Sequence, residues 1–236
     1  MADITTIGTA MDLQTKQLEH ISNNLANAGT PGFKAVHLYL LKGIEEIIGA
    51  DENIDIPSTL MADFSQGIPQ KTNNPLDLSL QREGFFVVQT NQGEAYTKNG
   101  SFTVNQSNQI VTQDGHLVLG DSGPITLIDG KINISNEGAV FVDGNEVGKL
   151  KIVDFTHRQA LVKTSGSLYF DEGKASLKTV DKPNIQSGFL ELSNVNVVTE
   201  MADMISINRL FETYQKMIQA LQDQDKLAVS RIGKLI

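Results

Sequence analysis

The last stretch of the chain, Asn196–Ile236, reads NVVTEMADMISINRLFETYQKMIQALQDQDKLAVSRIGKLI. Steps of alternately three and four residues from Val197 visit twelve positions, of which ten are apolar or aromatic; Glu200 and Asp225 are the exceptions. This spacing is typical of a helix that packs lengthwise against other helices. The apolar positions, which we call the C-terminal seam, are Val197, Met204, Ile207, Phe211, Tyr214, Ile218, Leu221, Ala228, Ile232 and Leu235.

A shorter apolar stripe lies beside the C-terminal seam and indicates more than one neighbouring helix. It consists of Met201, Ile205, Leu210 and Met217. Each apolar side chain that becomes fully covered contributes roughly 1.5–3 kcal/mol, whereas an isolated helix is only marginally stable in water. The sequence therefore predicts that this helix finds partners.

The first 28 residues follow the same spacing. The N-terminal seam consists of Ile4, Ile7, Met11, Leu18, Ile21 and Leu25, and Gln14 is its one polar position. The pattern stops at the Gly-Thr-Pro-Gly sequence of residues 29–32, where Pro31 prevents helix continuation. We predict a helix at each end of the chain. The two helices belong either to an ordinary hairpin that closes a monomer or to an assembly element.

The middle of the chain has a different pattern. Residues 35–75 are predicted to be an extended connector with a possible short helix, and their acidic residues are interpreted as solvated surface or, alternatively, as an electrostatic partner site. From residue 76 the apolar period changes to two, and turn dipeptides recur, such as Asp143-Gly144. Strands are predicted at residues 76–80, 85–88, 101–104, 116–119, 125–128, 132–134 and 150–153. We expect an antiparallel all-β domain, a barrel or a folded sandwich, at residues 76–189.

These patterns together predict an α+β fold. Long N- and C-terminal helices, in residues 1–34 and 190–236, would pack as a coiled-coil-like helical core domain. The antiparallel β domain would be inserted between them.

Composition and charge argue against several classes of function. The formal net charge is −9 and the pI about 4.9, which disfavours nucleic acid as a partner. The chain has no cysteine, and its four histidines fall in separate segments. The sequence contains no nucleotide-binding or hydrolase motif, so we predict no catalytic, cofactor or metal site. Neither a secretory signal nor a stretch of 18 uncharged apolar residues is present, so direct membrane insertion is not expected.

Two short motifs carry a resemblance to a known family. The N-terminal motif comprises Asn23, Asn24, Leu25, Ala26, Asn27, Thr30, Pro31, Gly32, Phe33 and Lys34, and the C-terminal motif comprises Gly188, Glu191, Ser193, Asn194 and Val195. Together with β motifs from Pro75 to Gly120, they make the chain similar to the axial proteins of the bacterial flagellum, the rod and hook subunits. Arg82 and the sequence after Gly120 resemble the proximal-rod type more than the distal-rod type. Asp12 departs from the family pattern, which commonly has glycine near this position.

The resemblance implies a structural subunit of the flagellar basal-body rod and no enzymatic activity. The implied partners are other copies of the chain, other rod subunits and the flagellar type III export apparatus. The implied location is the rod, which spans the periplasm, after export without a cleaved signal. Two alternatives remain: a distal-rod subunit of the same family, and an enzyme on a β scaffold with a helical dimerisation arm.

Overall fold

The computed structural model describes residues 4–40, 58–164, 166–180 and 182–232. In this part of the chain the helices are α1 (Ile4–Ala26), the 3-10 helix η1 (Arg158–Ala160) and α3 (Val197–Ile232). The chain folds into two compact units. The helical unit contains Met1–Ala26, Val36–Met61 and Asn196–Ile236, and the β unit contains Asn27–Ala35 and Ala62–Val195.

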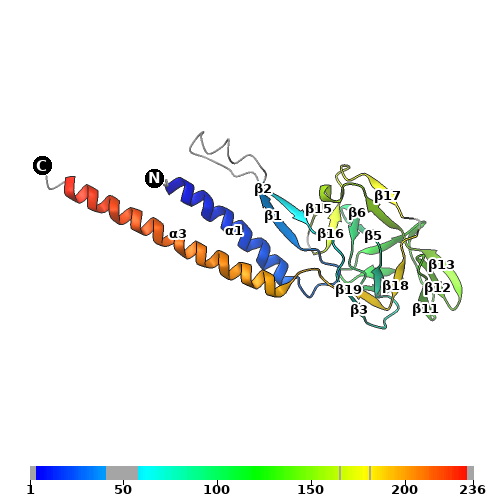
Figure 1. The fold of residues 1–236 in the computed structure, drawn as a ribbon. Helices are drawn as coiled ribbons and strands as arrows, with labels where there is room; N and C mark the ends of the chain where they lie inside the picture. The colour runs from blue at the N-terminus through cyan, green and yellow to red at the C-terminus, as the bar shows by residue number, and fades with distance from the viewer. Residues whose placement is uncertain (1–3, 41–57, 165, 181, 233–236) are drawn as a thin grey trace. The chain divides into compact units, whose positions relative to one another are not determined.

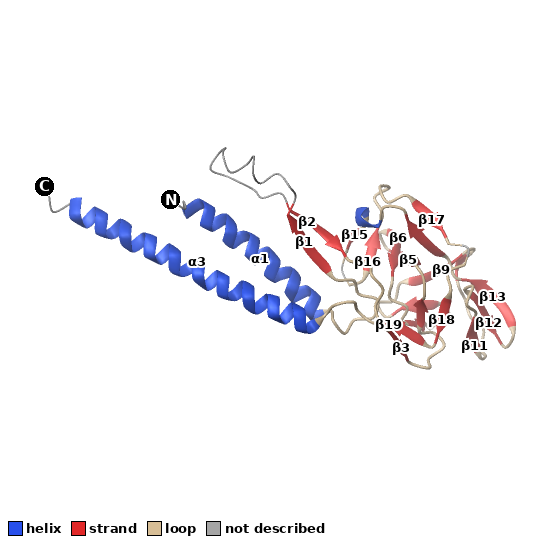
Figure 2. Cartoon of the chain, viewed as in Figure 1, coloured by secondary structure: helices blue, strands red, loops and turns tan. Residues whose placement is uncertain are grey.

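Short strands make up most of the remaining regular structure (Figure 2). They are β1 (Val36–Leu40), β2 (Ser58–Ala62), β3 (Pro69–Lys71), β4 (Leu78–Leu80), β5 (Phe85–Thr90), β6 (Gly93–Thr97), β7 (Phe102–Val104), β8 (Ile110–Thr112), β9 (Leu117–Gly120), β10 (Gly123–Pro124), β11 (Ile132–Ile134), β12 (Ala139–Val142), β13 (Asn145–Lys149), β14 (Ile152–Phe155), β15 (Val162–Lys163), β16 (Leu168–Phe170), β17 (Leu177–Thr179), β18 (Ile185–Ser187) and β19 (Phe189–Glu191). Residues 125–128, predicted as a strand, form only an isolated bridge at Thr126.

In the helical unit, α1 and α3 lie side by side (Figure 1). Helix α1 ends at Ala26, just before the predicted stop. The side chain of Asn196 caps α3, because its Oδ1 accepts hydrogen bonds from the backbone N–H groups of Val198 at 3.1 Å and Thr199 at 3.3 Å. Residues 36–40 form strand β1, and the rest of the predicted short helix lies outside the described residues.

The core of the β unit is organised around β5. This strand lies inside the largest sheet, where it pairs antiparallel with β6, β9 and β14. Its side chains alternate between two buried apolar clusters: Phe86 and Val88 join one cluster, and Phe85 and Val87 join the other. A strand buried on both faces needs a continuous apolar sequence, which explains residues 85–88. The ring of Phe85 packs edge-on against Phe155, with centroids 5.7 Å apart.

The predicted fold class was wrong. The described chain is mainly β, and both clusters of buried apolar residues lie in the β unit and not between the terminal helices. The N-terminal helix has only 23 residues, against 36 in α3, so the two ends do not supply the pair of long helices that was predicted to form a coiled-coil-like core. Heptad spacing was a poor guide because it identifies the helix face that is able to pack. It does not say whether residues of the same chain cover that face.

Candidate assembly site

The C-terminal seam forms the least exposed face of α3 after its first turn. Met204, Ile207, Phe211, Tyr214, Ile218 and Leu221 are half-buried, while the residues between them are exposed. Val197, at the start of the helix, is 39% exposed. The side chains of Ala228, Ile232 and Leu235 lie outside the description. The seam residues thus share one face, and that face is only partly covered.

The N-terminal seam has a similar, partial burial. Ile7 is only 3% exposed, and Met11, Leu18, Ile21 and Leu25 are half-buried. The side chain of Ile4 lies outside the description. Helix α1 therefore contributes one fully buried seam residue among those described.

Large apolar side chains remain exposed along α3. Val198 is 77% exposed, Ile205 is 54% exposed and Met201 is 49% exposed. Leu210 at 46% and Met217 at 42% are exposed as well. These residues include the whole stripe that the sequence placed beside the seam. Exposed apolar residues that recur along one helix indicate a surface that another molecule covers.

Asn24 joins three elements of the helical unit. Its amide Oδ1 accepts a hydrogen bond from the N–H of Val36 at 3.0 Å, and its Nδ2 donates to the carbonyl oxygen of Val36 at 3.0 Å. The same Nδ2 donates to Oε1 of Glu200 at 3.1 Å. Asn24 is 1% exposed and Glu200 is 7% exposed, so these bonds form away from water. The residue therefore ties the end of α1 to strand β1 and to the first turn of α3.

In the β unit, Lys34 and Glu191 form a buried ion pair between the two family motifs. The Lys34 Nζ lies 2.5 Å from Glu191 Oε1 and donates a second hydrogen bond to the carbonyl oxygen of Ser65 at 2.6 Å. Glu191 Oε1 also accepts the backbone N–H of Gly67 at 2.8 Å. The two side chains are 0% and 2% exposed. Two buried charges persist in a protein only when they are paired in this way.

Backbone contacts extend this junction on both sides of the ion pair. The N–H of Gly32 donates to the carbonyl oxygen of Glu191 at 2.7 Å, and the N–H of Ala35 donates to Asn194 Oδ1 at 2.8 Å. The Nδ2 of Asn194 donates to the carbonyl oxygen of Asp63 at 2.8 Å. Gly32 has a φ of 67°, and an added Cβ would meet neighbouring backbone, so only glycine fits.

The remaining motif residues shape the local chain. The N–H and the hydroxyl of Thr30 donate to the carbonyl oxygen and to Oδ1 of Asn27, at 3.0 and 3.3 Å. Ser193 Oγ accepts the N–H of Val195 at 3.2 Å, and Gly188 has a φ of 79°. Asn23, Leu25, Ala26 and Pro31 lie in or just after α1.

Sequence analysis missed Lys163, which lies far from both motifs in the sequence. Its Nζ lies 3.5 Å above the ring centroid of Phe33 and donates to the carbonyl oxygen of Lys34 at 3.2 Å. Burial lowers the pKa of Lys163 to about 8. No sequence signal distinguished this lysine from the others.

Two of the four histidines, which lie in separate segments of the sequence, line the same cavity. His20 and His37 line a cavity of about 320 Å³ in the helical unit, together with Glu200 and Asp203. Burial lowers the pKa of His20. Within the described residues, no group of three or more histidine, aspartate or glutamate side chains is placed to hold a metal ion. None of the described helices has the length and apolarity required to cross a membrane.

Three family profiles match the chain. Residues 4–34 match "Flagella basal body rod protein", residues 79–142 match "Flagellar hook protein FlgE/F/G D1 domain", and residues 186–230 match "Flagellar basal body rod FlgEFG protein C-terminal". The first and third profiles contain the two motifs whose residues meet in the structure.

Individual relatives match along nearly the whole chain. The flagellar basal-body rod protein FlgF of Caulobacter vibrioides is 33% identical over 228 residues, which cover 93% of this chain and 93% of that protein. The FlgF protein of Escherichia coli is 35% identical over 238 residues, with 92% and 94% covered. The FlgG rod protein of C. vibrioides is 32% identical over 262 residues, with 98% and 99% covered. The chain belongs to the flagellar basal-body rod protein family, which confirms the resemblance and the predicted function in the rod.

Proposed function

We propose that this protein is a structural subunit of the proximal part of the rod. It would join other copies of itself and other rod subunits through the apolar faces of α1 and α3, and so form part of the tubular shaft that transmits torque. The similarity to two FlgF proteins over more than nine-tenths of the chain supports this assignment. The relatives are named as rod proteins, which also supports a role without enzymatic activity.

The observation that carries the proposal is the incomplete coverage of α3. Its seam residues are half-buried, and Val198, Ile205 and Leu227 are 77%, 54% and 61% exposed. Covering apolar surface contributes about 25 cal/mol per Å². A helix with this much apolar surface exposed is therefore stabilised by association with neighbouring subunits.

The remaining parts of the proposal concern export and ordering. We propose that the terminal segments, residues 1–34 and 190–236, act as the assembly domain and pass through the flagellar type III export apparatus without cleavage of a signal. Packing against neighbours would then complete their order. The net charge of −9 supports protein partners over nucleic acid, and the protein would not insert directly into a membrane.

Charged substitutions on the C-terminal seam test the proposal. Phe211→Asp or Ile218→Asp places a carboxylate where an apolar contact is expected, so each variant should be absent from isolated basal bodies and should abolish swimming in soft agar. Gln219→Asp, at an exposed polar position of the same helix, is the matched control. The β unit of each variant should unfold at the wild-type temperature. Normal swimming by Phe211→Asp and Ile218→Asp cells would refute the assembly role of this face.

A distal-rod role is the second candidate, because the FlgG protein of C. vibrioides matches 98% of this chain. Epitope labelling of isolated basal bodies distinguishes the two. Label at the inner end of the rod supports the proximal assignment, and label near the hook supports the distal one.

A further inference from the structure

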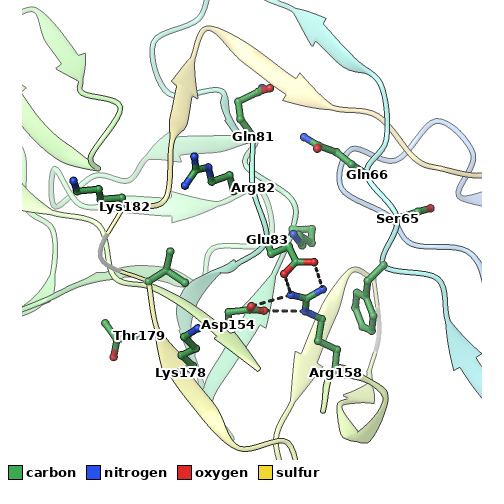
Figure 3. A pocket seen from close by; sticks show the side chains of 13 residues that line it. Ser65, Gln66, Gln81, Arg82, Glu83, Asp154, Arg158, Lys178, Thr179 and Lys182 are labelled. Carbon is green, nitrogen blue, oxygen red and sulfur yellow. Dashed lines mark hydrogen bonds and ion pairs between the residues drawn. The ribbon is translucent and has the colours of Figure 1, made fainter. Parts of the chain in front are cut away.

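A cationic cavity lies in the β unit, and Ser65, whose carbonyl oxygen accepts a hydrogen bond from Lys34, is among the residues that line it. Its volume is about 810 Å³, and the loop after β4, strand β17 and helix η1 contribute to its lining (Figure 3). Five basic side chains face two carboxylates there, in a chain whose formal net charge is −9. The basic residues are Arg82, Lys98, Arg158, Lys178 and Lys182.

Both carboxylates of the cavity are already engaged by a single guanidinium. Arg158 donates from Nε to Asp154 Oδ1 at 2.9 Å and from Nη2 to Asp154 Oδ2 at 2.8 Å. Its Nη1 donates to Glu83 Oε1 at 2.9 Å, as the dashed lines of Figure 3 show. The other four basic residues form no ion pair with any described residue. The cavity therefore presents uncompensated positive charge.

Lys98 is the most deeply buried of these four cations. The residue is 7% exposed, and its Nζ lies 5.1 Å from the ring centroid of Phe85. Glu191 and Asp154 act on its charge from a distance, but these carboxylates form their ion pairs with Lys34 and Arg158. Burial lowers the pKa of Lys98 to about 8, so the ammonium remains charged at neutral pH. A carboxylate that enters the cavity would supply this largely buried ammonium with a hydrogen-bond acceptor.

The volume suits a peptide segment, and this chain contains an acidic one. Residues 41–57, which lie outside the description, hold five carboxylates and one lysine, a net charge of 1 − 5 = −4. The carboxylates are Glu45, Glu46, Asp51, Glu52 and Asp55. We propose that the cationic cavity binds the acidic segment 41–57 of a second copy of this chain.

The geometry of assembly favours this occupant. Every copy carries one cavity and one acidic segment, so the contact is heterologous and repeats from copy to copy without a special end subunit. The inference deepens the proposed function and rests on it, because it names one contact between neighbouring subunits. Opposite charge would also guide the approach of the next subunit.

A binding titration tests the inference on the full chain. A synthetic, fluorescently labelled peptide of residues 41–57 is added to the purified protein, and its anisotropy is followed. Saturable binding is expected at 0.15 M salt and should weaken at 1 M, because the Debye length falls from about 8 Å to about 3 Å. The same peptide with its five carboxylates replaced by amides should not bind.

Charge reversal of the protein locates the site. Substituting three exposed cations of the cavity should weaken peptide binding at least about tenfold; the changes are Arg82→Glu, Lys178→Glu and Lys182→Glu. The matched control reverses three exposed lysines elsewhere in the β unit and should bind like wild type; its changes are Lys71→Glu, Lys131→Glu and Lys174→Glu. Near-ultraviolet circular dichroism verifies that both variants remain folded.

Several results would overturn the inference. Equal loss in both triple variants, or equal binding of a pentaglutamate peptide, would show general attraction of polyanions. Binding only after the five carboxylates of the protein's own segment are neutralised would show that the segment occupies the cavity of its own chain. Absence of binding would reject the contact but leave the proposed function intact, because that function is tested through the seam variants and swimming.

Discussion

Removal of the buried ammonium of Lys34 should destabilise the β unit strongly. In Lys34→Met, the carboxylate of Glu191 remains 2% exposed but loses the partner that lies 2.5 Å from its Oε1. One hydrogen bond remains, from the N–H of Gly67 at 2.8 Å. Glu191 Oε2 has no hydrogen-bond partner among the described residues, and the positive charge of Lys98, which interacts with Glu191 without forming an ion pair, offsets the carboxylate only in part.

The expected magnitude follows from this geometry. Breaking a buried ion pair by removing one partner costs about 3–5 kcal/mol, because the other charge is left uncompensated. At about 2–4 °C per kcal/mol, the midpoint of thermal unfolding should fall by roughly 6–20 °C. The double variant Lys34→Met, Glu191→Gln removes both charges. It should therefore be more stable than Lys34→Met alone, by about 1–3 kcal/mol.

Urea unfolding followed by tyrosine near-ultraviolet circular dichroism measures this effect in the β unit. The chain has no tryptophan, and Tyr96 and Tyr169 are buried in the β unit. Lys151→Met is the control, because Lys151 and Glu94 form a partly exposed pair at 2.9 Å, which contributes at most about 1 kcal/mol. If Lys34→Met and Lys151→Met cost the same, the argument that burial sets the value of the Lys34 pair fails.

Two further predictions use the same unfolding measurement. Burial lowers the pKa of Lys98 to about 8, below the value of about 10.4 in an unfolded chain, so the unfolded state binds more protons between pH 8 and 10. The free energy of unfolding should rise over that range, by about 2 kcal/mol from this lysine, and Lys98→Met should reduce the slope; an unchanged slope would contradict this assignment. Gly32→Ala should cost about 3 kcal/mol or more, since φ is 67° and the new Cβ meets backbone at Lys98. Gly115→Ala, at a φ of 84° with open space around it, should cost only about 1–2 kcal/mol, and equal costs would contradict the role of close approach.

Some strands with a strong apolar signal were predicted from the sequence, but the apolar strands β8 and β12 were not. The apolar run of residues 85–88 indicated β5, and Asp143-Gly144 forms the predicted tight turn between β12 and β13, with φ values of 50° and 85°. Strands β3 and β17 were missed because their residues are exposed throughout and show no alternation. Strands are predicted from alternating apolar and polar residues, a pattern that arises only when one face of the strand is buried. Strands β3 and β17 have no buried face.

A turn dipeptide gave less information than expected at residues 99–100. The Asn-Gly sequence there does not close a hairpin, since β6 pairs with β5 and β16 whereas β7 pairs with β8. Gly100 instead allows the backbone of Leu78 to approach, where an added Cβ would meet the carbonyl oxygen. Glycine serves either a positive φ or a close approach, and the sequence does not distinguish the two.

The motif residues were found from the sequence, but their contacts were not. Lys34 and Glu191 are 157 positions apart, and Asn24 and Glu200 are 176 positions apart. A single sequence has no periodicity that connects such distant residues, so neither the Lys34–Glu191 ion pair nor the Asn24–Glu200 hydrogen bond could be predicted. The carbonyl oxygen of Ser65 and the side chain of Lys163, which complete the surroundings of Lys34, lie outside both motifs.

The seams show what helical periodicity does and does not establish. The heptad spacing selected the face of α3 that carries the half-buried seam residues from Met204 to Leu221. The period therefore indicated which face of the helix is the less exposed one. It could not give the extent of coverage, because one neighbouring helix contacts only part of an apolar face. On α3, Met201 and Leu210 remain 49% and 46% exposed beside the half-buried seam. The apolar face of α3 is broader than the surface that α1 covers, so further partners are needed to bury the rest of it. The argument for an assembly role therefore depends on the exposure of these apolar side chains and not on the heptad pattern alone.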